Sequence, residues 1–217
     1  MSALRFTLLA DGPTDAVLLY PLRWLLIHSN VARPIEPAYA DLRPLPAPPR
    51  RLEEKVAAAL DLYPCDLLFV HRDAECQPRE DRIGEIRQAI QRVSGELLAS
   101  KPYVCVVPVR MTEAWFLFDE PAIRRAAGNP AGRSPLSLPP PEKIEGLPNP
   151  KQALHELLLK ATELPSRRLR RFSPTQACHR LAELIEDFGP LRQLPAFAAV
   201  ETELRSIIQT AGWSGLP

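Results

Sequence analysis

The sequence lacks several features that would place it in a familiar class of protein. No apolar run approaches the ~18 residues that a membrane-spanning helix needs, and no G-x-x-x-x-G-K-S/T phosphate loop is present. The four cysteines form no C-x-x-C pair, so neither a zinc site nor a disulfide framework is expected. The formal net charge is +1, so the overall charge does not point to a nucleic-acid partner.

The first residues and the cysteines favour a cytoplasmic location. The N-terminal stretch does not have the layout of a secretory signal, because its apolar part is short and ends at Asp11. Cys65 and Cys105 lie at or within strand-like runs, where a buried free thiol is the ordinary interpretation. We therefore expect a cytoplasmic protein with no membrane partner. Its 217 residues suffice for one α/β core with a helical appendage.

Proline and arginine are the residues that the sequence has in excess. It contains 25 prolines among 217 residues, more than twice the usual share of about 5%. Of the 27 basic residues only five are lysine. Arginine binds phosphate oxygens through two hydrogen bonds at once, but a genome rich in G and C would produce the same bias. Composition alone therefore leaves the purpose of the arginines open.

Apolar runs of strand length alternate with amphipathic helical segments through the first part of the chain. The expected strands are 4–10, 35–42, 67–71 and 103–109. The helices between them include 51–62 and 80–98. This alternation is typical of a parallel sheet with right-handed crossovers. We therefore predict an α/β domain over residues 1–127, with a Rossmann-like parallel sheet flanked by helices.

The character of the sequence changes after Phe118. Residues 128–150 are rich in Pro, Gly and Ser and are predicted to form a loop. Asn149 and Ser173 each precede a proline and stand three residues before a glutamine, which predicts two capped helices. A third helix is expected from about 195 to 211. Residues 151–217 are thus predicted to be a helical C-terminal part packed on the first domain.

Acidic residues follow three of the predicted strands. Asp11 and Asp15 follow the first, Asp73 and Glu75 the third, and Glu113 the fourth. The carboxyl ends of parallel strands meet in one crevice, and a 2-1-3 strand order would place Asp11 near Asp73. Clustered carboxylates are costly unless a divalent metal neutralises them. The sequence therefore predicts a Mg²⁺ or Mn²⁺ site whose ligands are Asp11, Asp73, Glu75 and Glu113, the first three of which are also the predicted catalytic residues.

Each of these residues also has a simpler structural interpretation. Asp11 can cap the helix that follows it, and the Asp73–Glu75 pair can stabilise a helix start through the macrodipole. Glu113 can cap a short helix whose Trp115 belongs to the core. His71, at the end of a buried strand, is more often a hydrogen-bonded structural residue than a metal ligand.

Arginines adjoin the acidic turns and also form one dense run. Arg72 and Arg110 lie beside the acidic turns, where they can bind substrate phosphates or pair with the neighbouring carboxylates. Phosphate neutralisation dominates affinity for nucleic acid, although short basic runs are also common on solvated surfaces. We predict phosphate binding for both of these arginines and for the run formed by Arg167, Arg168, Arg170 and Arg171.

Several of these motifs resemble the TOPRIM fold. D-G-P-T-D at 11–15 and D-A-E at 73–75 are similar to its acid-Gly turn and its Asp-x-Asp pair. The likeness extends to a family of uncharacterised TOPRIM-like prokaryotic proteins and covers almost the whole chain in short, moderately specific motifs. Its further pieces are E-A-W-F-L-F-D at 113–119, N-P-K-Q-A-L at 149–154 and R-F-S at 171–173. Asp11 stands where that family has Glu, and Glu75 where it has Asp, so each carboxylate is displaced by one methylene.

The resemblance implies a Mg²⁺-dependent nuclease. By analogy with that family, Asp73 and Glu75 would hold the metal, Asp11 would be a third ligand or a general acid/base, and Glu113 would be an outer ligand. It also implies a role in anti-phage defence beside an ATPase partner. Two alternatives are a non-catalytic scaffold that docks an effector through its helices, and a small-molecule phosphohydrolase or phosphotransferase. The missing glycine-rich phosphate loop disfavours the last of these.

Overall fold

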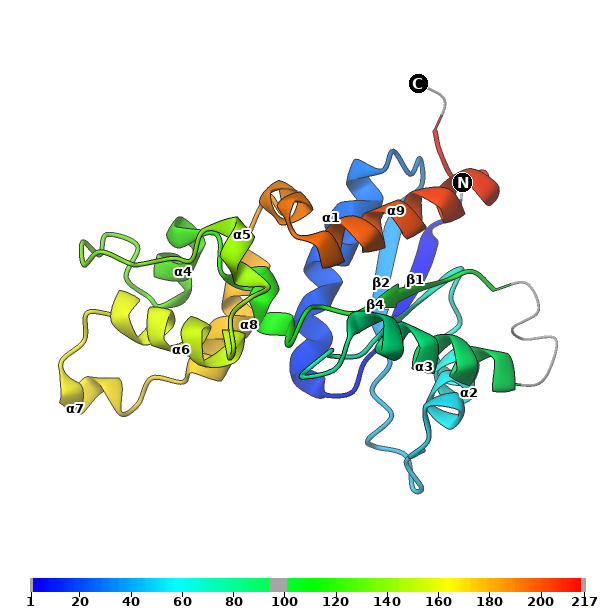
Figure 1. Cartoon of the computed structure of the whole chain (residues 1–217), viewed down its shortest axis with the longest axis horizontal. Coiled ribbons are helices and arrows are strands. Elements are labelled where there is room, and N and C mark those ends of the chain that lie inside the picture. Colours follow the sequence, from blue (N-terminus) through cyan, green and yellow to red (C-terminus); the bar gives the residue numbers. More distant parts are fainter. Residues whose placement is uncertain (1, 94–100, 216–217) are drawn as a thin grey trace. The chain divides into compact units, whose positions relative to one another are not determined.

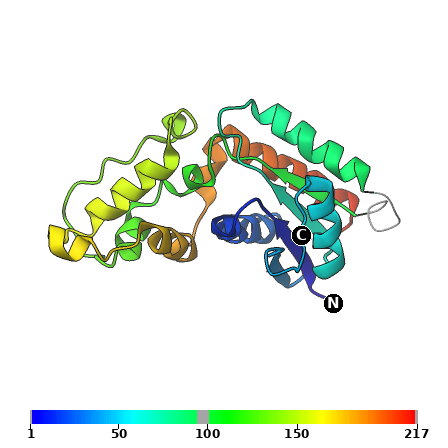
Figure 2. The ribbon, with the colours of Figure 1, turned by 90° about the horizontal axis from the view of Figure 1, so that it is seen from below.

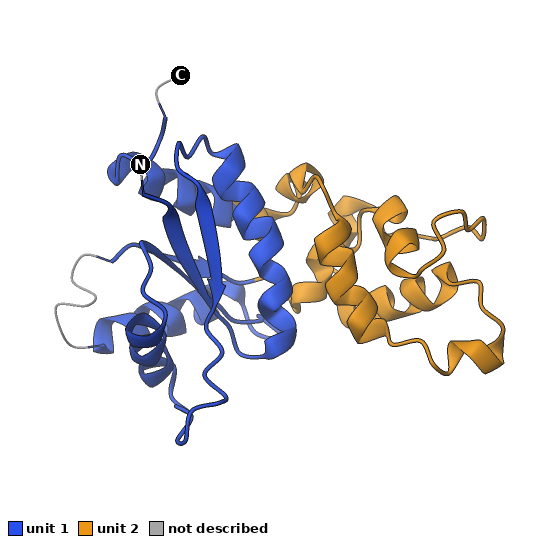
Figure 3. Ribbon diagram, turned by 180° about the vertical axis from the view of Figure 1, so that it is seen from behind, with its two compact units in different colours: residues 1–107, 199–217 blue, residues 108–198 orange. Residues whose placement is uncertain are grey.

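The structure is a computed structural model that describes residues 2–93 and 101–215 (Figure 1). The chain divides into two compact units (Figure 3). The first, which we call the α/β unit, comprises residues 1–107 and 199–217, and the second, the helical unit, comprises residues 108–198. No helix among the described residues is long and apolar enough to cross a membrane.

The α/β unit is built on a four-stranded parallel sheet. In spatial order its strands are β2 (Ile35–Tyr39), β1 (Leu4–Leu9), β3 (Leu67–His71) and β4 (Tyr103–Val106). Leu8 of β1 pairs with Tyr39 on one side and with Phe69 on the other. Helices flank the sheet, so the predicted α/β fold is confirmed. The predicted adjacency of the first and third strands is confirmed as well, and it brings two carboxyl ends together.

Helices cover both faces of this sheet. They include α1 (Leu19–His28), α2 (Leu52–Leu62) and α3 (Arg79–Arg92). The chain moves one way from β1 to β2 and the other way from β2 to β3 and β4, so right-handed crossovers place α1 opposite α2 and α3 (Figure 2). Successive side chains of each strand point to opposite faces of the sheet. Leu68 and Val70 join the core beneath α2 and α3, whereas Phe69 points to the other face, where its ring centroid lies 5.3 Å from that of Phe6.

The last helix and the unit boundary differ from the predicted domain limits. α9 (Pro195–Thr210) belongs to the α/β unit from Ala199 onward. There the Cys105 amide of the edge strand donates a hydrogen bond to the Glu203 carboxylate at 3.3 Å. The boundary falls after residue 107 instead of 127, because β4 ends and the chain leaves the sheet at Pro108. The packing of a helical C-terminal part on the first domain stays a prediction.

The helical unit is a group of short helices. They are α4 (Glu120–Ala126), α5 (Pro141–Ile144), α6 (Pro150–Ala161), α7 (Ser166–Leu169) and α8 (Pro174–Leu184), with 3-10 helices η2 (Thr112–Phe116) and η3 (Gly189–Gln193). Trp115 is completely buried, as predicted, and its ring meets that of Phe197 edge-on with centroids 5.1 Å apart. Buried aromatic and aliphatic side chains therefore hold this unit together.

The predicted helix caps are present. Asn149 accepts a hydrogen bond from the Gln152 amide at 2.9 Å, and Ser173 accepts one from the Gln176 amide at 3.3 Å. The helix that Ser173 caps, α8, ends at Leu184, and η3 begins at Gly189. Positions 94–98 of the helix predicted over 80–98 lie outside the described residues.

The segment predicted as a loop, residues 128–150, contains α5 and is tied to its surroundings. The Glu163 carboxylate accepts hydrogen bonds from the amides of Arg133 and Ser134, each at 2.6 Å. A Cβ added to Gly132 would lie only 2.6 Å from a neighbouring side-chain amide nitrogen. A larger residue at this position would therefore have to displace the side chains that surround the turn.

Candidate metal centre

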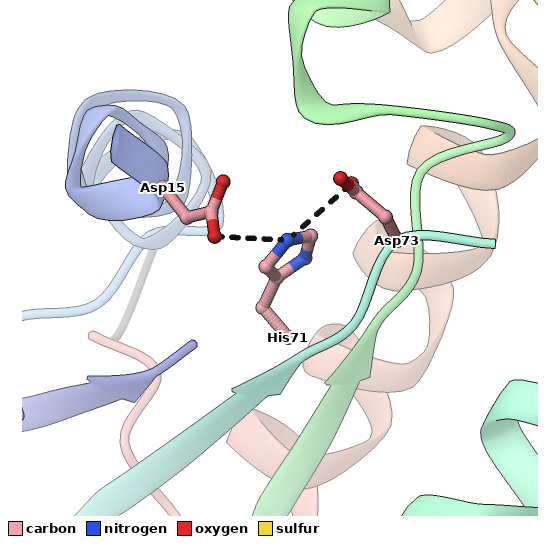
Figure 4. A group of neighbouring side chains, drawn as sticks. All are labelled: Asp15, His71 and Asp73. Carbon is pink, nitrogen blue, oxygen red and sulfur yellow. Dashed lines mark ion pairs between the residues drawn. The ribbon is translucent and has the colours of Figure 1, made fainter. Parts of the chain in front are cut away.

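Three side chains converge at the carboxyl ends of β1 and β3: Asp15, His71 and Asp73 (Figure 4). One ligand atom from each lies within 4.8 Å of the others. His71 Nε2 is 3.5 Å from Asp73 Oδ1 and 3.8 Å from Asp15 Oδ2. We call this group the Asp–His–Asp triad. It occupies the edge of the sheet where parallel α/β folds bind their ligands.

His71 is held in one orientation. It is the last residue of β3 and is only 1% exposed. Its Nδ1 lies 3.0 Å from the Val106 carbonyl oxygen of the neighbouring strand. A carbonyl oxygen only accepts, so Nδ1 carries a proton, and in the neutral ring the lone pair is on Nε2, the atom that faces the two carboxylates. A ring nitrogen that donates to a backbone carbonyl is the usual support of a metal-binding histidine.

Asp15 is positioned by the turn that follows β1. Pro13 begins the 3-10 helix η1 (Pro13–Leu18), and the Gly12 amide donates to Asp15 Oδ2 at 3.0 Å. The Tyr39 hydroxyl donates to the Gly12 carbonyl at 2.7 Å and ties the turn to β2. Burial and the negative charges of Asp15 and Asp41 raise the pKa of Tyr39 to about 12. The hydroxyl therefore stays protonated and keeps this bond throughout the neutral range.

The spacing of the triad suits one divalent ion. Neighbouring ligand atoms about 2.0–2.2 Å from a common ion are about 2.8–3.6 Å apart in octahedral or tetrahedral geometry. The distances of 3.5 and 3.8 Å from His71 Nε2 thus need only a small inward movement of the carboxylates. Two carboxylates and one imidazole form a donor set that divalent metals bind in proteins. The triad is therefore a possible metal site.

Of the predicted ligands, Asp73 alone joins the triad. The Asp11 carboxylate lies on the opposite side of β1 and β3 from the triad. There it forms ion pairs with Lys55 Nζ and Arg72 Nε, each at 3.2 Å. Burial acts to raise the pKa of Asp11, but the charges of Arg72 and Lys55 and their hydrogen bonds outweigh it, so this pKa is lowered. Strand alternation explains the direction: Asp11 continues the series of Leu9, whose side chain packs under α2 and α3.

Glu75 also lies apart from the triad in this structure. Its backbone is left-handed, with φ of 54°, and its carboxylate lies 3.4 Å from Arg82 Nη2. The side chain is 66% exposed. A left-handed non-glycine residue next to a ligand-binding edge is uncommon, and such positions concentrate at functional sites. The roles of Asp11 and Glu75 as metal ligands stay predictions.

Glu113 belongs to the helical unit, where it is 3.2 Å from Lys151 Nζ. Burial and the charge of Glu113 raise the pKa of the nearby Cys178 thiol to about 12. That thiol therefore stays protonated at neutral pH and is a poor nucleophile. The structure gives Glu113 an ion-pair partner within its own unit, and its role as a metal ligand stays a prediction.

The predicted phosphate-binding arginines fall into two groups. Arg72 lies at the sheet edge between Asp11 and Glu85, whose carboxylate is 2.6 Å from Arg72 Nη1. The other five belong to the helical unit. Arg110 has a left-handed backbone with φ of 63°. The remaining four lie within α7 or just after it and have exposed side chains: Arg167, Arg168, Arg170 and Arg171.

Two triad members, Asp15 and His71, were not among the predicted ligands. A signal for His71 is present in the sequence: it stands two residues before Asp73 and two after Phe69. Alternation along a strand therefore puts His71 on the face away from α2 and α3, and Asp73 continues that series. Asp15 lies in a 3-10 helix, where strand alternation gives no guidance.

Comparisons of the chain with protein-family models, with curated proteins and with solved structures gave no match. The function of this chain is therefore inferred from its own residues and their geometry, and the TOPRIM-like resemblance stays an expectation from sequence motifs.

Proposed function

We propose that the protein is a divalent-metal-dependent nuclease that hydrolyses phosphodiester bonds of nucleic acid. The observation that carries this proposal is the Asp–His–Asp triad at the carboxyl ends of two adjacent parallel strands. Asp15 comes from the segment after β1, whereas His71 ends β3 and Asp73 follows it, and the three donors meet at the edge where such sheets bind ligands. An anionic polymer that passed along this edge could also meet Arg72, which lies on the other side of the strand from the triad, between Asp11 and Glu85.

The residues of the triad would have distinct tasks. Asp15 and Asp73 would hold the ion through carboxylate oxygens, and the Val106 carbonyl would keep His71 Nε2 directed at it. A divalent ion bound there supplies an acidified water and a positive charge beside the phosphate. Arg72 would bind a phosphate oxygen of the substrate, because a guanidinium forms charge-assisted hydrogen bonds with phosphate.

The donor set favours Mn²⁺ over Mg²⁺ within this proposal. Carboxylates suit Mg²⁺, Ca²⁺ and Mn²⁺, whereas imidazole suits transition metals. An imidazole ligand at His71 therefore disfavours Mg²⁺ and Ca²⁺ relative to Mn²⁺. We propose Mn²⁺ as the better activator, with Mg²⁺ as a weaker one.

Cleavage of labelled oligonucleotides tests the proposal. Single- and double-stranded DNA and RNA would be incubated with the protein in Mn²⁺, in Mg²⁺ and in EDTA. We expect cleavage that requires the metal and that falls at least ~100-fold in Asp73→Asn, since loss of a mere supporting partner already costs 10–100-fold. Asp81→Asn, an exposed carboxylate on α3, is the control with the same change of charge. Equal cleavage by Asp73→Asn and the wild type would contradict the proposal.

A non-catalytic scaffold is the second candidate, and one observation favours it. Asp11 and Glu75, the acids that depart from the TOPRIM-like pattern, are both held in ion pairs with basic side chains. In that case the triad is a structural group and the protein binds no metal. An ATPase partner and a role in anti-phage defence are proposals that follow from the resemblance alone.

A further inference from the structure

The Asp11 carboxylate bridges two cations that come from different elements. Lys55, on α2, approaches Oδ1 at 3.2 Å, and Arg72, just beyond β3, approaches Oδ2 through its Nε at 3.2 Å. One oxygen thus faces each cation. Two oxygens of a phosphate group can meet the same two cations in the same way, because phosphate and carboxylate both present paired anionic oxygens to a guanidinium fork.

The cations are held in place by more than Asp11. The Glu85 carboxylate on α3 accepts a hydrogen bond from Arg72 Nη1 at 2.6 Å and another from Arg82 Nη1 at 3.0 Å. Arg72 would therefore keep its orientation if Asp11 moved away. The side chains of Lys55 and Arg72 are 25% and 26% exposed, so they are partly shielded yet reachable from solvent.

The charge balance of this group fits an exchange of anions. Lys55, Arg72 and Arg82 carry three positive charges, and Asp11, Glu85 and Glu75 carry three negative ones. A phosphodiester also carries one negative charge, so it can replace the Asp11 carboxylate without changing the net charge of the group. A small cavity of about 90 Å³ adjoins Asp11 and Lys55 and gives the displaced side chain room to turn.

We propose that Lys55 and Arg72 form a binding site for one phosphate group of a nucleic-acid strand, and that Asp11 occupies this site until the strand displaces it. The proposal deepens the proposed function and rests on it for the identity of the substrate. Arg72 stands between His71 and Asp73 in the chain but points to the opposite side of the strand. The phosphate at Lys55 and Arg72 would therefore be a neighbour of the one that is cleaved.

Binding of a fluorescein-labelled oligothymidylate in EDTA tests this site without any metal or cleavage. Asp11→Asn removes the competing charge, and we expect it to bind about tenfold more tightly than the wild type, the scale of a charge-assisted hydrogen bond. Asp61→Asn is the matched control: it makes the same charge change at an exposed carboxylate of α2, the helix that carries Lys55. Equal affinities of the two variants would overturn the proposal.

The salt dependence of the same binding gives a second, independent readout. Each lost phosphate contact lowers the slope of log K against log salt by about 0.7 for a single strand. We expect this loss in Lys55→Gln and not in Lys143→Gln, an exposed lysine on α5. An unchanged slope in Lys55→Gln would overturn the site even if that variant bound more weakly.

The outcomes also separate this site from the proposed nuclease. Tighter binding by Asp11→Asn together with no cleavage in Mn²⁺ would keep the phosphate site and remove the nuclease. Cleavage in Mn²⁺ together with equal binding by Asp11→Asn and Asp61→Asn would do the reverse. Circular dichroism and thermal unfolding of each variant would establish that the compared proteins are folded.

Discussion

The basic residues of the two units are arranged in opposite ways. At the sheet edge of the α/β unit, Arg72 lies between Asp11 and Glu85, and Arg82 lies between Glu85 and Glu75. In the helical unit, the arginine run around α7 is exposed, and no carboxylate among the described residues lies within ion-pair distance of its four side chains. Carboxylate partners therefore fix the direction of the arginines at the sheet edge. Among the described residues, no such partner constrains the four arginines of the run.

This difference bears on what each region can contribute to the binding of a polyanion. Paired arginines are oriented before a ligand arrives, so they lose little freedom on binding and can select a geometry. Unpaired exposed arginines offer positive charge without a fixed direction, and such charge attracts any phosphate backbone in a salt-dependent way. We infer that the sheet edge supplies position and that the arginine run supplies general affinity.

Neutralising the whole arginine run would test most strongly whether the run supplies general affinity for a polyanion. The quadruple variant Arg167→Gln, Arg168→Gln, Arg170→Gln and Arg171→Gln should lower the salt slope of single-strand binding by up to about 2.8, because each contact contributes about 0.7. We expect weaker binding of every sequence alike, and an unchanged rate of cleavage at saturating substrate. Fluorescence anisotropy at several salt concentrations measures the slope.

Either of two results would contradict the role in general affinity that we infer for the arginine run. A slope that stays at the wild-type value would show that the run is ordinary solvated surface. A loss of cleavage at saturating substrate, with affinity unchanged, would assign the run to the chemistry instead of to general attraction.

The stability of Asp11→Asn tests whether the ion pairs at the sheet edge contribute to the fold through the charge of Asp11. The folded-state pKa of Asp11 is lowered, so its ion pairs stabilise the fold above the unfolded-state pKa of about 3.9. That stabilisation is lost as the pH falls through the lowered pKa. The carboxylate is 43% exposed, and solvent screening limits the effect to no more than about 1 kcal/mol. Urea unfolding of wild type and variant between pH 7 and pH 2 measures it.

We expect the variant to be less stable at pH 7 and the two proteins to converge once the pH falls below the lowered pKa of Asp11, where the wild-type carboxylate is protonated. A difference that persists unchanged at low pH would mean that Asp11 acts through packing or hydrogen bonding and not through its charge.

Much of the fold was predictable from the sequence because local signals agreed there. β3 was predicted over 67–71, as observed, since it is an apolar run bounded by polar residues. The caps at Asn149 and Ser173 were predicted for the same local reason. The partner of the last helix was not predictable, because an amphipathic pattern shows which face is buried but not what covers it. The contact between Cys105 and Glu203 joins distant parts of the chain.

The sequence indicated the edge of the sheet at which the candidate site lies, but it named only one of the three triad residues as a ligand. Acidic residues after parallel strands located the sheet edge, and Asp73 lies in the triad. The separation of Asp11 from Asp73 follows from the two sides of a strand, which a list of acidic residues does not take into account. His71 was interpreted as structural because a histidine at the end of a buried strand is more often a hydrogen-bonded structural residue than a metal ligand. Its hydrogen bond to the Val106 carbonyl is compatible with either role.

Manganese titration by isothermal calorimetry tests the central claim, that Asp15, His71 and Asp73 are the metal ligands. The informative variants are His71→Asn, which keeps a donor near Nδ1 and removes Nε2, and Glu75→Gln, which removes the carboxylate that the sequence motif favours. Asp15→Asn is less informative because Asp15 also holds the Gly12 turn. We predict Mn²⁺ binding by the wild type and by Glu75→Gln, and a loss of at least 10–100-fold in affinity in His71→Asn. Unchanged binding by His71→Asn, with binding lost in Glu75→Gln, would contradict this account and place the metal with the ligands that the sequence predicts.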